Sequence, residues 1–203
     1  PILPLTMLKT KSLKGVSIPE LERTYDKIHA WFFAYPQGEF SLNALSKAIS
    51  MGKTTTKIVV LFLEKEGFLI KTEIGRLWRI KANQYHPYFI GRKIPFNLKM
   101  VYESGIIDSI KQGLPNSRCI TLFGSFRRGE DIETSDLDIA VEVIDNKPIQ
   151  IESITIKEFG YRKNIKANIH IFSRSNIDLN LFANIANGIV LDGFLEVGLE
   201  AKP

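Results

Sequence analysis

Apolar residues recur at helical spacing in the first third of the chain. The segment Ser17-Ile-Pro-Glu20 is typical of a helix start, because it combines a capping box with an early proline. The apolar stripe that follows consists of Leu21, Tyr25, Ile28 and Phe32. This pattern predicts a helix that buries one face and ends at Pro36 and Gly38.

The residues that follow predict two more helices and a hairpin. A short helix is expected from Ser41 to Ile49, and a third helix from about Lys53 to Glu66, where Gly67 is a good stop. The inward face of the third helix would consist of Ile58, Leu61 and Phe62. Two short strand-like runs, FLIKTE and RLWRI, then predict a hairpin.

This order of elements resembles a winged helix-turn-helix domain, and the resemblance covers residues 17–83. It implies that the third helix is the recognition helix and that the hairpin is the wing. Ammonium groups and short donors at a helix N-terminus suit the phosphates and base edges of double-stranded DNA. The candidate DNA-binding residues are Lys53, Thr54, Thr55, Thr56, Lys57 and, at the hairpin tip, Arg76. The alternative is a winged helix that serves only for dimerisation or packing.

The pattern of the remaining chain predicts a linker and a second domain. Residues 84–97 hold two prolines and little periodicity, so we assign them to a linker between a domain at 17–83 and one at 98–203. Residues 1–16 are assigned to a loose basic arm. A helical pattern runs from Leu98 to Lys111, and RCITLF predicts a buried strand. SDLDIAVEV alternates, which predicts a half-buried strand with Leu137, Ile139 and Val141 inward.

Charge is divided unevenly between the two halves of the chain. The net charge of the 203 residues is +5, but residues 1–100 carry 16 Lys+Arg against 7 Asp+Glu, and residues 101–203 carry 11 against 15. A basic half joined to an acidic half indicates two domains with different partners, and the basic half is the candidate for nucleic acid. The chain shows no membrane-length apolar run and no basic-first secretory signal. The lone Cys119 cannot form an internal disulfide, so we expect a cytoplasmic protein.

Candidate chemistry is concentrated in LFGSFRRGEDIETSDLDIAVEV. A strand runs into Gly124-Ser125, ten residues follow, and then come Asp136 and Asp138. Alternation places the two aspartates on one face of a strand, about 6–7 Å apart. Hard cations such as Mg²⁺ take carboxylate oxygens together with substrate phosphates. Glycine lets a phosphate approach the backbone, and a helix start behind it offers free N–H groups. The stretch therefore predicts a site for a nucleotide and a divalent cation.

The spacing of Gly-Ser, ten residues and Asp-Leu-Asp resembles the nucleotidyltransferases of the DNA polymerase beta superfamily. The wording GSFRRGE…SDLD is similar to the minimal nucleotidyltransferase branch of that superfamily. The resemblance implies that Gly124 and Ser125 hold the triphosphate of an NTP, that Asp136 and Asp138 are catalytic and hold Mg²⁺ or Mn²⁺, and that Arg128 helps with phosphate. It also implies a small mixed α/β domain, so the whole chain is expected to be an α+β protein.

The family places a third acidic residue on a later strand, and this chain departs from that pattern. The later strand is IKANIHIFS, where Asn168 and His170 occupy the expected face. Glu142 shares the face of the two aspartates but lies about 13 Å beyond Asp138. Glu152 or Glu158 could fold back, and the sequence leaves this open. His170 could act as a base or a ligand, or be a satisfied core residue.

Two functions from different classes remain open at this point. In the first, the chain is an enzyme that transfers a nucleotidyl group to a hydroxyl on protein, nucleic acid or a small molecule. In the second, it is a DNA-binding regulator whose nucleotidyltransferase domain is degenerate and only senses a nucleotide or forms a homodimer. The closing segment NGIVLDGFLEV resembles the ending of archaeal nucleotidyltransferase-like proteins, which implies an archaeal origin.

Overall fold

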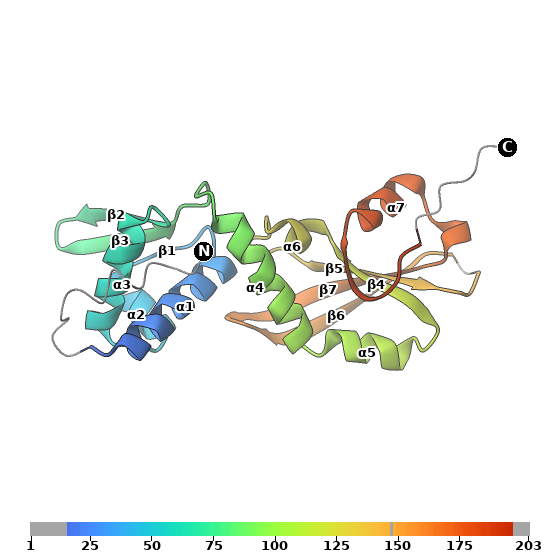
Figure 1. Ribbon diagram of the computed structural model, residues 1–203, viewed down its shortest axis with the longest axis horizontal. Helices are drawn as coiled ribbons and strands as arrows, with labels where there is room; N and C mark the ends of the chain where they lie inside the picture. The colour runs from blue at the N-terminus through green and yellow to red at the C-terminus, as the bar shows by residue number, and fades with distance from the viewer. Residues whose placement is uncertain (1–15, 147, 197–203) are drawn as a thin grey trace. The chain divides into compact units, whose positions relative to one another are not determined.

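The computed structural model describes residues 16–146 and 148–196, and these form two compact units. Unit 1 contains residues 16–32 and 38–83, and unit 2 contains residues 33–37, 84–146 and 148–196 of the described chain. Helices and two β-sheets are both present, as expected for an α+β protein (Figure 1). Of the predicted basic arm, residues 1–15 lie outside the described residues.

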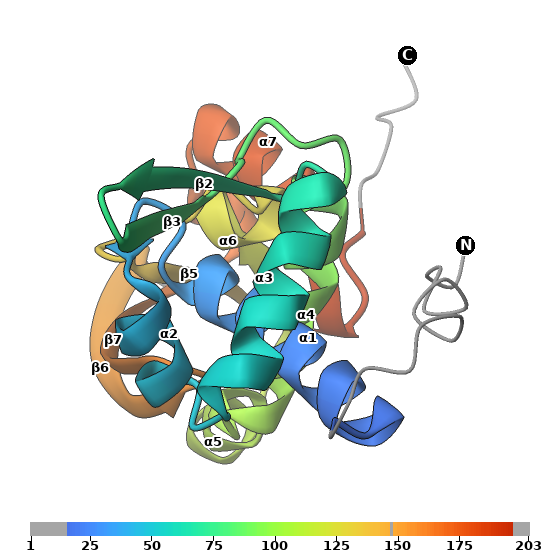
Figure 2. The same cartoon turned by 90° about the vertical axis from the view of Figure 1, so that its left-hand side faces the viewer.

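Unit 1 has its elements in the order expected from the sequence, with one short strand added. The elements are α1 (Ile18–Ala34), β1 (Glu39–Phe40), α2 (Leu42–Ala48), α3 (Lys53–Lys65), β2 (Leu69–Ile74) and β3 (Leu77–Ala82), of which α1 ends within unit 2. The three strands form an antiparallel sheet in the order β1-β3-β2 beside the helices (Figure 2). Ser17 Oγ accepts a hydrogen bond from Glu20 N, and Ser41 Oγ accepts one from Ala44 N, so both predicted helix starts are capped.

The inward face of α3 differs from the predicted one. The predicted stripe of α1 is buried at Leu21, Tyr25, Ile28 and Phe32. On α3, however, Leu61 is 41% exposed, and the buried residues are Thr55, Thr56, Val59, Val60 and Leu63. The predicted stripe differs because two threonines lie on the buried face, which the spacing of apolar residues does not reveal. Each threonine hydroxyl has an internal acceptor, which makes its burial inexpensive.

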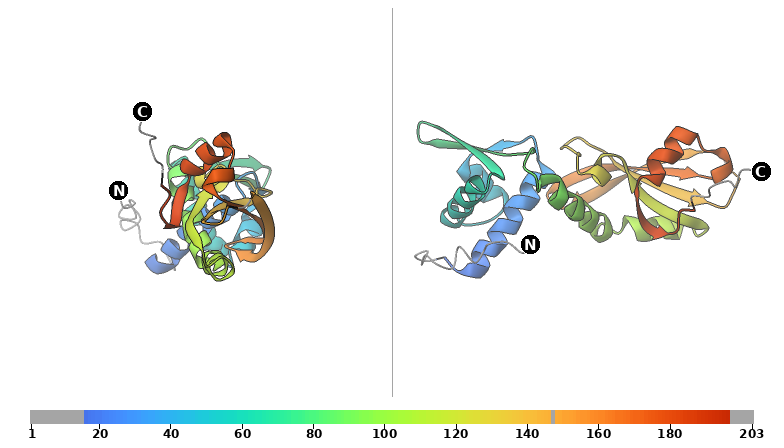
Figure 3. Two further views of the ribbon diagram at one scale, coloured as in Figure 1. Left: turned by 90° about the vertical axis from the view of Figure 1, so that its right-hand side faces the viewer. Right: turned by 45° about the horizontal axis from the view of Figure 1, so that its top comes forward.

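Unit 2 is built on a five-stranded mixed sheet. Its elements are α4 (Phe89–Glu103), α5 (Ile106–Gly113), β4 (Ser117–Phe123), α6 (Gly124–Arg128), β5 (Leu137–Val143), β6 (Gln150–Phe159), β7 (Arg162–Phe172), a 3₁₀ turn η2 (Arg174–Asn176), α7 (Leu179–Ala186) and β8 (Ile189–Gly193). The strand order is β6-β7-β5-β4-β8, in which β5 and β7 are parallel and the other neighbours antiparallel. The right-hand view of Figure 3 shows β6 and β7 running side by side as a long hairpin.

Two apolar clusters cover the two faces of this sheet. Helices α4 and α5 pack on one face, where Val101 and Ile110 join the inward residues of β5 that the sequence predicted. Helix α7 packs on the other face, where Ile185 meets Phe123 and Ala140 (Figure 1). Leu137, Ile139 and Val141 are fully buried, as expected from their alternation. Asp136 and Asp138 therefore belong to the face that carries α7. No helix of the described residues has the length and apolar character needed to cross a lipid bilayer.

The segment predicted as a linker is largely helical, which corrects the sequence analysis. Helix α4 begins at Phe89 and runs through Pro95, whereas we expected a helix from Leu98. Its buried stripe is Phe89, Lys93, Asn97 and Val101, each spaced by four residues. Two members of that stripe are polar, so the apolar pattern did not reveal the helix. The free energy gained by burying the whole stripe outweighs the loss of the hydrogen bond that Pro95 cannot donate.

The polar members of this stripe contact a buried carboxylate in the loop between α6 and β5. Asp131 is 2% exposed, and its Oδ1 lies 3.2 Å from Lys93 Nζ and 2.7 Å from Asn97 Nδ2. Lys93 also donates to the Asp131 carbonyl oxygen, and Asn97 donates to the Phe126 carbonyl oxygen at 3.0 Å. Burial raises the pKa of the Asp131 carboxyl and lowers the pKa of Lys93, and their attraction opposes both changes.

Arg162 fixes the same loop from β7. Its Nη1 lies 3.6 Å from Asp131 Oδ2, and its Nη2 donates to the carbonyl oxygens of Glu133 at 2.9 Å and Ser135 at 2.7 Å. Burial lowers the pKa of this guanidinium, and the Asp131 carboxylate opposes that change. The loop is thus held by α4 and by β7 up to the residue before Asp136. It connects the Gly124 turn to the aspartates.

We expect Asp131→Ala to destabilise unit 2 by about 3–5 kcal/mol, because it leaves the buried charges of Lys93 and Arg162 without their carboxylate. The measurement is urea unfolding followed by circular dichroism. Glu103→Ala is the control: it removes one partner of the exposed Lys99–Glu103 pair and should cost about 0.5 kcal/mol or less. Equal effects of the two substitutions would contradict the role given to Asp131.

Candidate functional site

The turn at Gly124 lies against Asp138. Strand β4 ends at Phe123, which is the register partner of Asp138 on β5. Gly124 then starts α6 with a φ of +72°, and a Cβ placed there would lie 2.6 Å from Asp138 Oδ2. A side chain at this position would therefore meet both backbone strain and the carboxylate. Gly124 and Asp138, which come from different segments of the motif, therefore lie side by side.

The two aspartates converge on one atom. Asp136 Oδ2 lies 3.1 Å from Asn168 Nδ2, and Asp138 Oδ1 lies 3.3 Å from the same nitrogen, which donates to both. Asn168 is the parallel register partner of Asp138 on β7. Of the two residues proposed for the third position, Asn168 is the one that lies between the carboxylates.

Two further side chains complete the polar surface around the aspartates. Lys166 Nζ lies 3.4 Å from Asp136 Oδ2, and its side chain is 54% exposed. Ser153 is the register partner of Asn168 on β6, and its hydroxyl donates to Asn168 Oδ1 at 3.0 Å. A row of register partners thus crosses four strands, from Ser153 through Asn168 and Asp138 to Phe123.

His170 borders the site without lying between the aspartates. Its Nε2 is 3.9 Å from Asp138 Oδ1, and its ring meets the Phe123 ring edge to face at 5.1 Å between centroids. The other nitrogen, Nδ1, is buried and has no hydrogen-bond partner among the described residues. His170 is therefore neither a fully satisfied core histidine nor the residue between the two carboxylates.

The glutamates left open by the sequence lie elsewhere. Glu142 is 2% exposed and is paired with Arg174, whose Nε lies 3.3 Å from Glu142 Oε1. Glu152 and Glu158 are exposed on β6 and pair in register with Ile169 and Lys163. Ile169 belongs to the cluster on the α4 and α5 face, so Glu152 points away from Asn168 and the aspartates. Lys163 lies five residues before Asn168 on β7, so Glu158 is roughly 16 Å along the sheet from the site. Within residues 16–146 and 148–196, no group of three or more His, Cys, Asp or Glu side chains is placed to hold a metal ion.

A hollow of about 530 Å³ adjoins the glycine turn. Its lining residues are Phe123, Gly124, Arg127, Arg128, Asn184 and Asn187. Arg128, which the sequence assigned to phosphate, lines the hollow and is paired with Glu130, with Nε 2.6 Å from Oε2. Arg127, Asn184 and Asn187 are lining residues that the sequence did not predict. The spacing of the motif gives no signal for the two asparagines, because they come from α7 and the residue that ends it, far along the chain.

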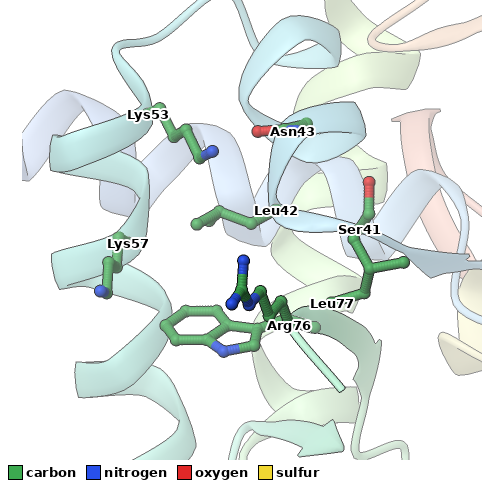
Figure 4. A pocket seen from close by; sticks show the side chains of 8 residues that line it. Ser41, Leu42, Asn43, Lys53, Lys57, Arg76 and Leu77 are labelled. Atoms are coloured by element: carbon green, nitrogen blue, oxygen red, sulfur yellow. The ribbon is translucent and has the colours of Figure 1, made fainter. Parts of the chain in front are cut away.

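The predicted DNA-contacting residues of unit 1 divide into two groups. Lys53, Lys57 and Arg76 line one pocket of about 250 Å³ together with Ser41, Leu42, Asn43, Leu77 and Trp78 (Figure 4). Among the described residues that line this pocket, none is a carboxylate. Lys57 Nζ lies 5.4 Å from the centre of the Trp78 ring, within the range of a cation–π interaction.

Thr55 and Thr56 are buried, which corrects their assignment to the DNA-binding surface. Thr55 is 3% exposed and donates to Glu20 Oε1 at 2.6 Å, and Thr56 is fully buried and donates to the Gly52 carbonyl oxygen at 2.9 Å. Both hydroxyls are used inside unit 1. Thr54 is exposed and stays a candidate.

The oxygen atoms of this site suit a hard divalent cation. Two carboxylates approach one point, and the side chain at that point carries an amide oxygen of its own. Carboxylate and amide oxygens are the ligands that Mg²⁺ and Mn²⁺ take in proteins. The residues present therefore fit such a cation, with one neutral group where the resemblance implied a third carboxylate.

Comparison with known proteins identifies the same segment. Residues 104–179 match the family model of the nucleotidyltransferase domain, and this segment includes Gly124, both aspartates and Asn168. Unit 2 contains a nucleotidyltransferase-like domain. No curated protein matches the chain. The match begins directly after α4 and does not extend to unit 1.

We expect Gly124→Ala to displace the Asp138 carboxylate and to lower the affinity for a metal–nucleotide complex, because its methyl group would contact Asp138 Oδ2. The matched control is Gly105→Ala, since Gly105 has the same φ of +72° but open space around its Cβ position. Both variants carry a backbone cost of about 1–2 kcal/mol. Titration calorimetry with MgATP should separate them, and equal affinities would contradict the contact argument.

Proposed function

We propose that unit 2 transfers a nucleotidyl group from an NTP to a hydroxyl acceptor in a reaction that depends on a divalent cation. In this reaction the acceptor oxygen bonds to the α-phosphorus, the bond from that phosphorus to the bridging oxygen of pyrophosphate breaks, and the hydroxyl proton leaves the acceptor. The observation that carries the proposal is the convergence of Asp136 and Asp138 beside a glycine turn that admits no side chain.

Different residues of the site would bind the cation, bind the triphosphate and accept the proton of the acceptor. Asp136 and Asp138 would hold Mg²⁺ or Mn²⁺, which when bound neutralises charge on the phosphates and on the departing pyrophosphate. The Gly124-Ser125 turn would approach the triphosphate. Arg127 and Arg128 would supply cations in the adjoining hollow. His170, with Nε2 near Asp138, is the nearest candidate to accept the proton of the acceptor.

A second function is favoured by Asn168 and Lys166. The Asn168 amide donates a hydrogen bond to Asp136, and the Lys166 ammonium forms an ion pair with the same carboxylate. The aspartates therefore have partners without any metal. A domain of this kind could bind a nucleotide without transferring it. In that alternative the chain is a DNA-binding regulator whose nucleotidyltransferase-like domain senses a nucleotide or only forms a homodimer.

For either function, we propose that unit 1 is a winged helix-turn-helix domain that binds double-stranded DNA. The pocket of Figure 4 supports this proposal, because Lys53, Lys57 and Arg76 line it and no carboxylate of the described residues does. Lys53 and Arg76 form no ion pair among the residues that the structure describes. Free cations from a helix start and a hairpin tip suit a phosphate backbone.

The test of transfer is incubation of purified protein with each labelled NTP, Mg²⁺ or Mn²⁺, and a host lysate. We expect label on an acceptor with the wild type and none with the Asp136→Asn/Asp138→Asn double variant. Titration calorimetry on both proteins separates the two functions. Nucleotide binding without transfer would favour the regulator, and unchanged nucleotide affinity in the double variant would refute the site.

The test of DNA binding is its salt dependence. Lys53→Ala with Lys57→Ala removes up to two phosphate contacts, so the slope of log affinity against log salt should fall by up to about 1.8. The measurement is fluorescence anisotropy with a labelled duplex. Lys65→Ala with Lys99→Ala is the control, because both lysines are exposed but lie outside the pocket. An unaltered slope in the first variant would contradict the assignment of α3.

A further inference from the structure

We propose that Asn168 is a reversible third metal ligand whose side-chain amide turns over when a divalent cation enters, and that Ser153 makes this turn possible. The inference rests on the proposed metal-dependent function of the site. It assigns a role to position 168, where this chain has no carboxylate. It makes Asn168 a ligand and Ser153 a positioning residue.

The orientation in the structure is the one suited to a site without a cation. Asn168 Nδ2 donates to both carboxylates, to Asp136 Oδ2 at 3.1 Å and to Asp138 Oδ1 at 3.3 Å. The amide NH₂ group and Lys166 together offset two negative charges that lie close to one another. In this orientation Asn168 presents no oxygen to the space between the aspartates.

The opposite orientation offers an oxygen at the same place. The oxygen and nitrogen of an asparagine amide are nearly equal in size, and its terminal torsion is broad and roughly two-fold. A half-turn therefore exchanges Nδ2 for Oδ1 without movement of the backbone. The group between the carboxylates then becomes an acceptor, which is unfavourable unless a cation lies there and favourable if one does.

Ser153 accommodates both orientations because a hydroxyl donates and accepts. At present its O–H donates to Asn168 Oδ1 at 3.0 Å. After the half-turn, Asn168 Nδ2 would donate to Ser153 Oγ, and the contact across the β6–β7 pair would persist. The register supports this, since Ser153 and Asn168 are direct partners and Asn168 and Asp138 are direct partners. A methyl group in place of the hydroxyl would support neither orientation.

The ammonium group of Lys166, the other partner of Asp136, can move away from the carboxylate. The Lys166 side chain is 54% exposed and flexible, and the Asp136 side chain that it contacts is 39% exposed. Its withdrawal exposes no buried charge. The cation would thus replace the lysine ammonium and the amide NH₂, and gain the amide oxygen.

The opposite interpretation is that Asn168 only blocks the site. The two interpretations predict changes of opposite sign in metal affinity when Asn168 or Ser153 is replaced. If the amide only competes with the metal, then removing it by Asn168→Ala, or weakening its support by Ser153→Ala, should tighten metal binding. If the amide is a ligand supported by Ser153, both substitutions should weaken it. Loss of a supporting contact of this kind lowers metal affinity by about 10–100-fold.

The experiment is titration of the full chain with Mn²⁺ alone, followed by calorimetry and by the electron paramagnetic resonance signal of free Mn²⁺. We expect Asn168→Ala and Ser153→Ala to bind about 10–100-fold more weakly than the wild type. Thr155→Val is the matched control, because Thr155 is exposed on the same face of β6 and loses only its hydroxyl. It should bind as the wild type does.

Equal or tighter Mn²⁺ binding by Asn168→Ala, while Asp136→Asn/Asp138→Asn loses it, would overturn this inference and leave the proposed function intact. Absence of Mn²⁺ binding by the wild type would also overturn this inference, whereas the proposed function is tested separately by the transfer assay, in which the nucleotide phosphates are present. A second readout observes the turn itself. In protein with ¹⁵N-labelled asparagine, the NH₂ signals of Asn168, identified by their loss in Asn168→Ala, should move upfield at saturating Mg²⁺. Unchanged shifts at saturation would overturn the half-turn.

Discussion

The site of unit 2 depends on one buried carboxylate, that of Asp131. The glycine turn and the aspartates belong to different strands, and the loop that joins them carries exposed polar residues that would not hold a single conformation alone. Asp131 draws cations from α4 and β7 to that loop, and Arg162 extends the contact to the carbonyl groups just before Asp136. A buried ion cluster adds little net stability, but it permits few alternative arrangements.

Two charge clusters in unit 2 therefore have different tasks. Around Asp131, every charge is buried and has a partner from a fixed element, so the cluster orders the backbone. Around Asp136 and Asp138, the partners are a half-exposed lysine and an amide that can reverse its polarity. The first cluster resists change in its surroundings, while the second can exchange its partners. This division is what a site that binds and releases an ionic ligand requires.

The sequence was sufficient to predict the structure where a single residue pattern determined it. Alternation placed Asp136 and Asp138 on one face, whereas the contact of Gly124 with Asp138 came from the pairing of β4 with β5. It was insufficient where burial depended on partners distant in the chain. Lys93 and Asn97 concealed a helix because their acceptor is Asp131, and Thr55 and Thr56 were assigned to the surface because their acceptors were unknown. Ser153 and Asn187 could be placed near the site only from the strand register and the folded structure.

The register row through Asn168 also bears on how such a site can be gained or lost. Asparagine and aspartate have the same shape, and their codons differ at a single base. Because strand pairing already places residue 168 between the two carboxylates, exchange of these two residues needs no rearrangement of the chain. One point mutation separates a neutral donor set from a fully acidic one. The protein therefore lies one mutational step from a chemically different version of itself, in either evolutionary direction.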